Sequence, residues 1–233
     1  MRIAIISDIH SNLEALDSAL KFIDRSDVNR IVCLGDIVGY GANPNECVDL
    51  VRERCESILL GNHDAAAVDV AEAEYFNPNA RMAAVWTNKQ LSEENRDYLI
   101  HRPLSANLQN ILFVHASPCA PRNWEYIMYA EEAVHAFRCF TEALCFVGHT
   151  HVPAMYSEGA RPDRLNRDVR SLINVGSIGQ PRDGNPDVGF GILDTDAWEF
   201  KQIRTKYDID AAAGKIRSAG LPRQLADRLY RGI

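Results

Sequence analysis

The sequence predicts a mixed α/β fold in which two β-sheets form the core and helices cover their outer faces. In the first half, short β-branched and aliphatic runs alternate with helical patterns, as in strand–helix–strand units. In the last third, short strands are joined by Gly, Asp and Pro turns. The 233 residues contain no Gly/Ser-rich or Pro-rich linker, so we expect a single domain over residues 1–233.

The apolar runs locate the expected strands. In the first two thirds they predict strands at residues 2–6, 30–34, 57–60, 110–114 and 143–147. In the last third they predict strands at residues 171–177, 188–194 and 198–203, which we expect to form an antiparallel meander.

Helix start signals precede several amphipathic segments. Ser11 stands three residues before Glu14, which is the spacing of a capping box, and predicts a helix to residue 23. Asn43 followed by Pro44 predicts a second helix, because proline is favoured at the first helical position. The polar helical pattern from residue 75 to 99 is interpreted as part of a helical excursion at about 65–110, with Asn77 and Ser92 as start signals. Two short helices are expected at 209–219 and 222–231.

Composition restricts the functional classes. A formal net charge of -7 argues against extended nucleic-acid binding, although a small phosphate substrate remains possible because a metal ion can supply local positive charge. No segment approaches the roughly 20 apolar residues of a membrane span, and the apolar run before Asp8 is too short for a signal peptide. The six cysteines form no C-x-x-C pair, so we expect reduced thiols in a cytoplasmic protein.

Residues of the kind that bind metals follow five of the predicted strands. Ligands gather beyond the carboxyl ends of strands in sheets of this type, so side chains distant in sequence are expected to converge there. Taken singly, each carboxylate or amide has an alternative role as a turn or cap residue, and each histidine as a neutral core imidazole. Taken together, these alternative roles would require the same coincidence at each of the five strand ends. The residues are Asp8, His10, Asp36, Asn62, His63, Asp64, His115, His149 and His151.

Oxygen and imidazole ligands without thiolate favour two divalent transition-metal ions drawn from Mn, Fe, Zn and Ni. One tetrahedral ion cannot use so many ligands, whereas two ions roughly 3.5–4 Å apart can. Asp36, after a central strand, is suited to bridge them. His149 and His151 point the same way in an extended segment, so each can serve one ion.

The order of the motifs resembles that of the calcineurin-like metallophosphoesterases, specifically the small bacterial and archaeal type. The motifs are D-x-H at 8–10, G-D at 35–36, G-N-H-D at 61–64, a lone histidine at 115 and G-H-x-H at 148–151. The segment "NVGSIGQPRD" at 174–183 is also similar to a late loop of these proteins, so the resemblance runs from residue 3 to about 183. It implies a four-layer αββα sandwich around two metals.

The resemblance also implies roles for individual residues. Asp36 would bridge the ions, and a metal-bound hydroxide would attack phosphorus. His63 would donate a proton to the leaving oxygen or steady the phosphate, for which Asn62 is a further candidate contact. The remaining ligands would divide into Asp8, His10 and His151 for the first metal and Asn62, His115 and His149 for the second.

One motif departs from the pattern of the phosphoprotein phosphatases. They carry G-D-x-V-D-R-G, whereas this chain reads "GDIVGYG", with Gly39 and Tyr40 in place of the Asp-Arg pair. Asp64 is a candidate to position His63, and Arg182 is a candidate replacement for the phosphate-binding arginine. For Arg182 a solvated loop residue is an equally valid interpretation.

We therefore expect a dinuclear metal-dependent phosphoesterase, and more specifically a phosphodiesterase acting on a small or nucleotide-like substrate. The alternatives are a phosphomonoesterase or dinucleoside-polyphosphate hydrolase, a nuclease, and a non-catalytic metal-binding scaffold on the same fold. The arginines at three-residue intervals are read as a solvated loop, with a basic rim facing the substrate as the alternative. They are Arg161, Arg164, Arg167 and Arg170.

Overall fold

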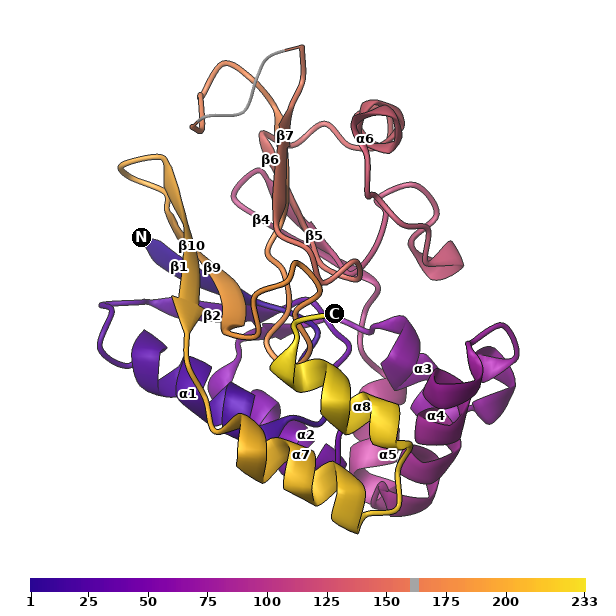
Figure 1. The fold of residues 1–233 in the computed structure, drawn as a ribbon. Coiled ribbons are helices and arrows are strands. Elements are labelled where there is room, and N and C mark those ends of the chain that lie inside the picture. Colours follow the sequence, from indigo (N-terminus) through magenta and orange to yellow (C-terminus); the bar gives the residue numbers. More distant parts are fainter. Residues whose placement is uncertain (160–163) are drawn as a thin grey trace.

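The computed structural model describes residues 1–159 and 164–233, in which two five-stranded mixed sheets pack face to face (Figure 1). The first sheet has the order β10-β9-β1-β2-β3, with β1 parallel to β2 and antiparallel to β9. Its strands are β1 (Arg2–Ile6), β2 (Arg30–Cys33), β3 (Ser57–Ile58), β9 (Val188–Asp194) and β10 (Glu199–Thr205). The second sheet has the order β4-β5-β6-β8-β7, with β5, β6 and β8 parallel. Its strands are β4 (Ser105–Leu108), β5 (Ile111–Val114), β6 (Leu144–Val147), β7 (Ala154–Ser157) and β8 (Ser171–Asn174).

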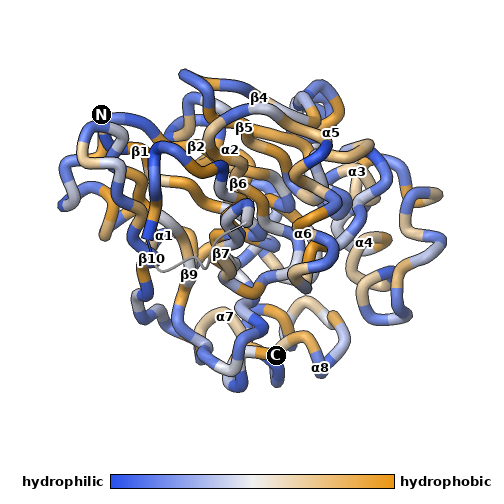
Figure 2. Tube along the Cα trace, turned by 90° about the horizontal axis from the view of Figure 1, so that it is seen from above, coloured by the Kyte–Doolittle hydropathy of each residue, from blue (hydrophilic) through white to orange (hydrophobic). Residues whose placement is uncertain are grey.

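Alternation along β1 shows how one strand joins two cores. Ile3 and Ile5 pack between the sheets, in a cluster that also contains Phe113 and Phe146 of the second sheet. Successive strand side chains point to opposite faces, so Ala4 and Ile6 belong to the other cluster, under the helices. The central strands are therefore buried on both faces, which is why their sequences are continuously apolar, as the hydrophobic colouring of the inner tube indicates (Figure 2).

Helices form the two outer layers. On the first sheet lie α1 (Leu13–Ile23) and α2 (Pro44–Arg54), whose apolar residues complete the core beneath that sheet. On the outer face of the second sheet lies α6 (Ala130–Ala136), which buries Ala133 and Ala136 against the strands. The mixed α/β class and the αββα layering are as predicted.

The helical excursion consists of α3 (Asn62–Val68), a 3₁₀ turn η1 (Val70–Ala73), α4 (Pro78–Gln90) and α5 (Glu93–Ile100). The predicted start signals of α4 and α5 act as N-caps: the side chains of Asn77 and Ser92 accept backbone N–H bonds from Ala80 and Asn95. A short 3₁₀ turn η2 (Pro121–Asn123) precedes α6. The chain ends with α7 (Ile209–Ser218), α8 (Arg223–Asp227) and a 3₁₀ turn η3 (Arg228–Tyr230).

Three details of the sequence prediction are wrong. The N-cap of α1 is Asn12, which accepts the backbone N–H of Ala15, and not Ser11. The last third does not form one meander, because β8 belongs to the second sheet while β9 and β10 pair in the first. Strands β4 and β7 were not predicted. They lie at the edges of their sheet and are only partly buried, so they lack the apolar runs that indicate the other strands.

The expectation of reduced thiols is also wrong for one pair of cysteines. Cys119, which follows β5, and Cys139, which follows α6, form a disulfide across 20 residues of sequence. No local sequence spacing predicts this disulfide, because the contact depends on how α6 folds back over the second sheet. The other cysteines are free, and all except Cys55 are buried.

The arginine series is held at the molecular surface. Arg170 forms an ion pair with Glu158, and Arg167 donates to the backbone carbonyls of residues 195 and 196. Arg161 lies outside the described residues. Among the residues that the structure describes, no helix is long and apolar enough to cross a membrane.

Candidate metal centre

The candidate ligands meet at one edge of the sandwich, just beyond the carboxyl ends of β1, β2, β3, β5 and β6. These strands run in parallel within their own sheets, so their ends deliver side chains to a common place. Every one of these side chains is buried, and they are Asp8, His10, Asp36, Asn62, His115, His149 and His151.

The ligand atoms fall into two groups that share Asp36. The first comprises Asp8, His10, Asp36 and His151, and the second comprises Asp36, His115 and His149. Within each group the ligand atoms lie within 4.8 Å of one another. Asp36 Oδ2 lies 3.6 Å from His10 Nε2 and 3.4 Å from His115 Nε2, so this oxygen faces both groups.

Backbone carbonyls hold three of the histidines in position. Nδ1 of His10 lies 3.1 Å from the Val38 carbonyl, and Nδ1 of His115 lies 3.1 Å from the Leu34 carbonyl. Nδ1 of His151 lies 2.7 Å from the Gln180 carbonyl. Because a carbonyl only accepts, each Nδ1 carries a proton, so in the neutral ring Nε2 is the nitrogen that has a lone pair for a metal.

Several buried atoms of this centre have no hydrogen-bond partner within the described protein. Asp36 Oδ2 and His149 Nε2 are both unpaired. Nε2 of His10 lies 3.0 Å from Nε2 of His151, although Nδ1 protonation leaves both neutral rings as acceptors there. Buried acceptors that face one another need a cation between them, so the residues fit divalent metal ions. Asn62 Oδ1, 3.2 Å from His115 Nε2, adds an oxygen ligand to the second group.

The electrostatics of the protein alone follow from burial and from close opposite charges. Burial by itself would raise the pKa of Asp36, but His115 and His63 outweigh it and hold that pKa well below its usual range. Burial acts against a charged His115, yet Asp36 raises the pKa of His115 to about 9. Burial lowers the pKa of His149 to about 3. Without a metal, the centre thus contains an ionised Asp36 and neutral imidazoles except at His115, which would have to lose its second proton to bind a metal.

The backbone at the centre is strained. Left-handed φ values between 52° and 65° occur at Asp8, His10, Asp36, His149 and His151. Such values are uncommon for non-glycine residues and cost on the order of 1–3 kcal/mol each. The tight turns direct successive side chains into one small volume.

His63 and Asp64 differ in what they contact. The His63 ring packs against Tyr40, with ring centroids 4.4 Å apart, and its buried Nδ1 has no partner within the described chain. Burial, assisted by Arg182 and opposed by Asp36, lowers the pKa of His63 to about 4. The Asp64 carboxylate instead accepts the backbone N–H groups of Val38 and Gly61, each at 3.0 Å, and so ties two ligand loops together.

Arg182 lies beside Tyr40, the residue that stands where the phosphoprotein phosphatases have an arginine. Its Nη2 is 3.5 Å from the Tyr40 hydroxyl and 2.8 Å from Gln180 Oε1, while its Nε is buried without a partner in the described chain. Arg228 approaches the same ring, with its guanidinium carbon 5.9 Å from the Tyr40 centroid. Burial and the charge of Arg182 lower the pKa of Arg228 to about 10.

Three residues near the centre were not identified from the sequence. Tyr126 stacks on His149 with ring centroids 4.0 Å apart, and Trp124 packs edge-on against His115 at 5.9 Å. Both lie in the irregular segment between β5 and α6, where no periodicity marks them. Arg228 lies near the C-terminus, and only the tertiary fold brings it to Tyr40.

Residues 1–197 match the calcineurin-like phosphoesterase superfamily domain, and the chain belongs to this family of metallophosphoesterases, hydrolases of phosphate ester bonds. A protein of Methanocaldococcus jannaschii without an assigned function is 41% identical over 243 residues, covering 99% of this chain and 98% of that protein. The crystal structure of a metallophosphoesterase from Sphaerobacter thermophilus is 41% identical, with a TM-score of 0.89 over 100% of this chain and 99% of that one. A hypothetical protein from Pyrococcus horikoshii shares the fold, with a TM-score of 0.84 at 18% identity over 100% of this chain and 98% of its own.

Proposed function

We propose that this metallophosphoesterase is dinuclear and acts chiefly as a phosphodiesterase on a small or nucleotide-like substrate. The proposal of two metal ions is supported by the two groups of candidate ligands that share Asp36. Asp8, His10 and His151 complete the first group, and Asn62, His115 and His149 complete the second. Two divalent ions from the set Mn, Fe, Zn and Ni suit these donors, and availability would decide among them.

When bound, the two ions would supply an activated water and neutralise charge on the phosphate. The protein's own residues position the candidate ligands and the substrate. Asp36 is held by the backbone N–H of His63, which donates to Oδ1 at 2.8 Å, so its other oxygen keeps a fixed direction. Asp64 keeps the loops of Val38 and Gly61 together. Asn62 and His63, adjacent at the start of α3, are the side chains that we assign to contact with the substrate phosphate.

His63 is assigned the proton transfer to the leaving oxygen. Its ring is confined by Tyr40 and by Phe76, whose centroid is 4.6 Å away, so it cannot turn freely. Its pKa of about 4 describes the site without substrate. A phosphate anion beside the ring favours the protonated form and raises that pKa toward the range in which an acid is useful.

Two features support a diester substrate with an aromatic group. The loop at 36–41 has Gly39 and Tyr40 in place of an Asp-Arg pair, and so lacks a guanidinium fork for a dianionic phosphate. Tyr126 is 51% exposed while one face of its ring stacks on His149. An exposed ring beside the reaction centre provides a surface on which a nucleobase can stack.

One observation favours the alternative of a phosphomonoesterase or dinucleoside-polyphosphate hydrolase. Arg182 stands beside Tyr40 and forms no ion pair among the described residues, and Arg228, whose Nε donates to the Ile233 oxygen, lies on the same ring. A guanidinium group without a carboxylate partner attracts an additional phosphate charge.

The two candidates are separated by kcat/KM on bis-nitrophenyl phosphate and on nitrophenyl phosphate, with Mn²⁺ as the metal. We expect the diester to be the better substrate and the ratio to change little in Arg182→Ala. Arg223→Ala is the matched control, because that arginine is exposed and, among the described residues, pairs only with Asp227. A strong monoester preference that Arg182→Ala reverses would establish the alternative.

Cytoplasmic localisation and the absence of a nucleic-acid partner are proposed from the sequence alone. The net charge of -7 supports a small substrate rather than a nucleic-acid backbone.

A further inference from the structure

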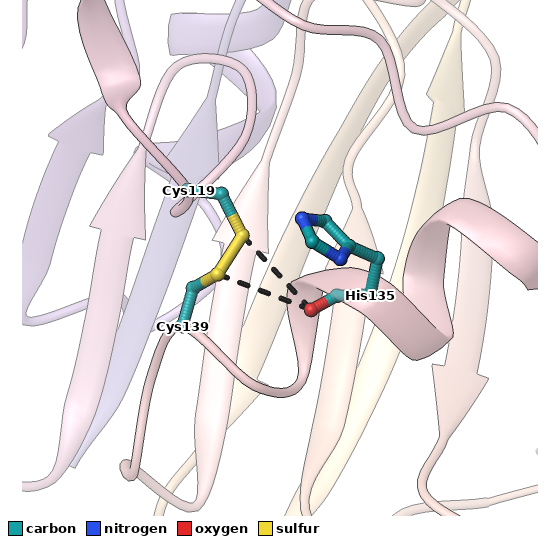
Figure 3. A group of neighbouring side chains, drawn as sticks. All are labelled: Cys119, His135 and Cys139. Carbon is teal, nitrogen blue, oxygen red and sulfur yellow. Dashed lines mark hydrogen bonds between the residues drawn. A yellow bond between two sulfur atoms is a disulfide. The ribbon is translucent and has the colours of Figure 1, made fainter.

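A second cluster of metal-type side chains lies away from the dinuclear centre, on the outer side of the second sheet. It consists of Cys119, His135 and Cys139, drawn in Figure 3, whose sulfur and imidazole atoms lie within 4.8 Å of one another. His135 and Cys139 are exposed and Cys119 is half-buried. We propose that, once the disulfide is reduced, these three residues form a surface site for a thiophilic divalent ion such as Zn²⁺, and that the disulfide is the oxidised form of this site.

The ligand set and its spacing support this proposal. Two thiolates and an imidazole are preferred by Zn²⁺, in contrast to the oxygen and imidazole donors of the dinuclear centre. His135 in the last turn of α6 and Cys139 just beyond it are separated by three residues, within the His-x₃₋₅-His spacing of zinc fingers. Cys119 supplies the third ligand from a segment 16 positions earlier in the chain.

The backbone already has the dimensions that such a site needs. Tetrahedral Zn²⁺ with Zn–S bonds of about 2.3 Å holds two sulfurs roughly 3.8 Å apart. The Cα atoms of Cys119 and Cys139 are 5.3 Å apart, so rotation about the Cα–Cβ bonds can place the sulfurs at that separation. The His135 carbonyl, 3.9 Å from each Sγ, is positioned to accept an S–H bond in the dithiol form. Because the cluster is at the surface, water can complete the tetrahedron.

The chemical steps balance with one external reactant. A dithiol reductant transfers two electrons and two protons to the Cys119–Cys139 bond and becomes a disulfide itself. Binding of the ion then displaces the two thiol protons, and the two thiolates with neutral His135 coordinate it. Both the disulfide and the metal-bound form link Cys119 to Cys139. Each therefore fixes the start of the segment in which Trp124 and Tyr126 lie, and those two rings contact His115 and His149.

The test uses thiolate-to-metal charge-transfer absorption in the full chain. Protein is reduced, freed of reductant, supplied with excess Mn²⁺ to occupy the oxygen and imidazole ligands, and titrated with Cd²⁺. We expect an ultraviolet Cd–thiolate band that saturates at one Cd²⁺ per chain. Protein that has not been reduced should show no band, and the same sample should show it after reduction and removal of the reductant. This comparison requires no mutation, and the dinuclear centre has no thiolate to contribute.

Variants then assign the ligands. Cys139→Ser should remove most of the band, and His135→Ala should weaken Cd²⁺ affinity about tenfold or more. Cys55→Ser and His101→Ala are matched controls, a free cysteine and an exposed histidine elsewhere, and should leave the titration unchanged. Absence of the band in reduced parent protein, or its persistence in Cys139→Ser, overturns the proposal without affecting the phosphoesterase assignment.

Discussion

The two oxygens of Asp36 have different surroundings. Oδ1 accepts the backbone N–H of His63 at 2.8 Å, whereas Oδ2 is buried without a hydrogen-bond partner in the described chain and faces His10 and His115. One oxygen therefore fixes the carboxylate, and the other is available to cations on both sides. This division of roles is the residue-scale basis for assigning Asp36 as the bridge.

His63→Ala should retain the metals and slow turnover. Proton donation typically contributes about 10²- to 10⁴-fold, and the loss should be largest for alkyl esters, whose leaving oxygen needs a proton. It should shrink for nitrophenyl esters, which leave as stable anions. Steady-state kcat on the two ester types measures the difference, with His101→Ala as the control. An equal loss on both would assign His63 to phosphate binding instead.

At this scale, the convergence of the candidate ligands was predictable because each of them follows an apolar strand. The apolar runs that precede Asp8, Asp36 and His115 indicate their positions at strand ends. Tyr126 and Arg228 are not, since they come from an irregular segment and from the C-terminal turn. Only tertiary structure brings Tyr126 to His149 and Arg228 to Tyr40.

The loops that carry the ligands pack so closely that side chains are excluded at two points. A Cβ on Gly61 would overlap the carboxylate and backbone N of Asp36, and one on Gly148 would overlap Ser7 Oγ and Asp8. The loops after β2 and β3 are thus in direct backbone contact, and the backbone of the loop after β6 lies directly against the side chains of Ser7 and Asp8 after β1. The arrangement of the ligands depends on this contact.

Gly61→Ala should therefore damage the centre, although it adds only one methyl group. Overpacking costs about 1–3 kcal/mol, and the strain falls directly on Asp36. We expect weaker Mn²⁺ binding in calorimetric titration and a lower unfolding midpoint. Gly214→Ala is the matched control, because Gly214 lies in α7 with nothing within 4 Å of its added Cβ and alanine favours helix there. Normal metal affinity in Gly61→Ala would show that the loops can separate without loss of function.

Strands buried on both faces were predictable, and the two edge strands of the second sheet were not. β1 spans the predicted residues because its sequence is continuously apolar. β4 alternates between exposed and half-buried residues, and β7 is half-buried throughout, so neither has a distinctive pattern. The sequence also contains no signal that β8 and β9 enter different sheets, because that choice is decided by pairing with distant strands.

At the scale of the whole molecule, burying a cluster of ionisable groups makes the stability of the metal-free protein depend on pH. Burial lowers the pKa of His63 to about 4 and of His149 to about 3, and also lowers those of His10 and His151. Between these values and the ordinary 6.5, the unfolded chain binds protons that the folded chain does not. The free energy of unfolding therefore rises with pH over that window.

Two groups act in the opposite direction. Burial and Asp36 raise the pKa of Asp64 to about 7, and Asp36 raises that of His115 to about 9, so their contributions are lost as pH rises through those values. Four histidines outweigh Asp64 on the acid side, and we expect maximum stability near neutral pH. Urea midpoints of chelator-treated protein across this range measure the profile, and His149→Gln should reduce the acid-side slope. A slope unchanged by that substitution would contradict the account.

The most direct test of the central claim is the number of Mn²⁺ ions bound per chain, measured by elemental analysis at saturation in parent protein, Asp36→Asn and the exposed control Asp17→Asn. Mn²⁺ is chosen because it avoids the thiol cluster. We predict two ions in the parent and in Asp17→Asn, and loss of both in Asp36→Asn with the fold retained by circular dichroism, because that change removes the charge that offsets the repulsion between the cations. A fully active parent with one ion, or Asp36→Asn with one ion at normal occupancy, would contradict a dinuclear centre bridged by Asp36.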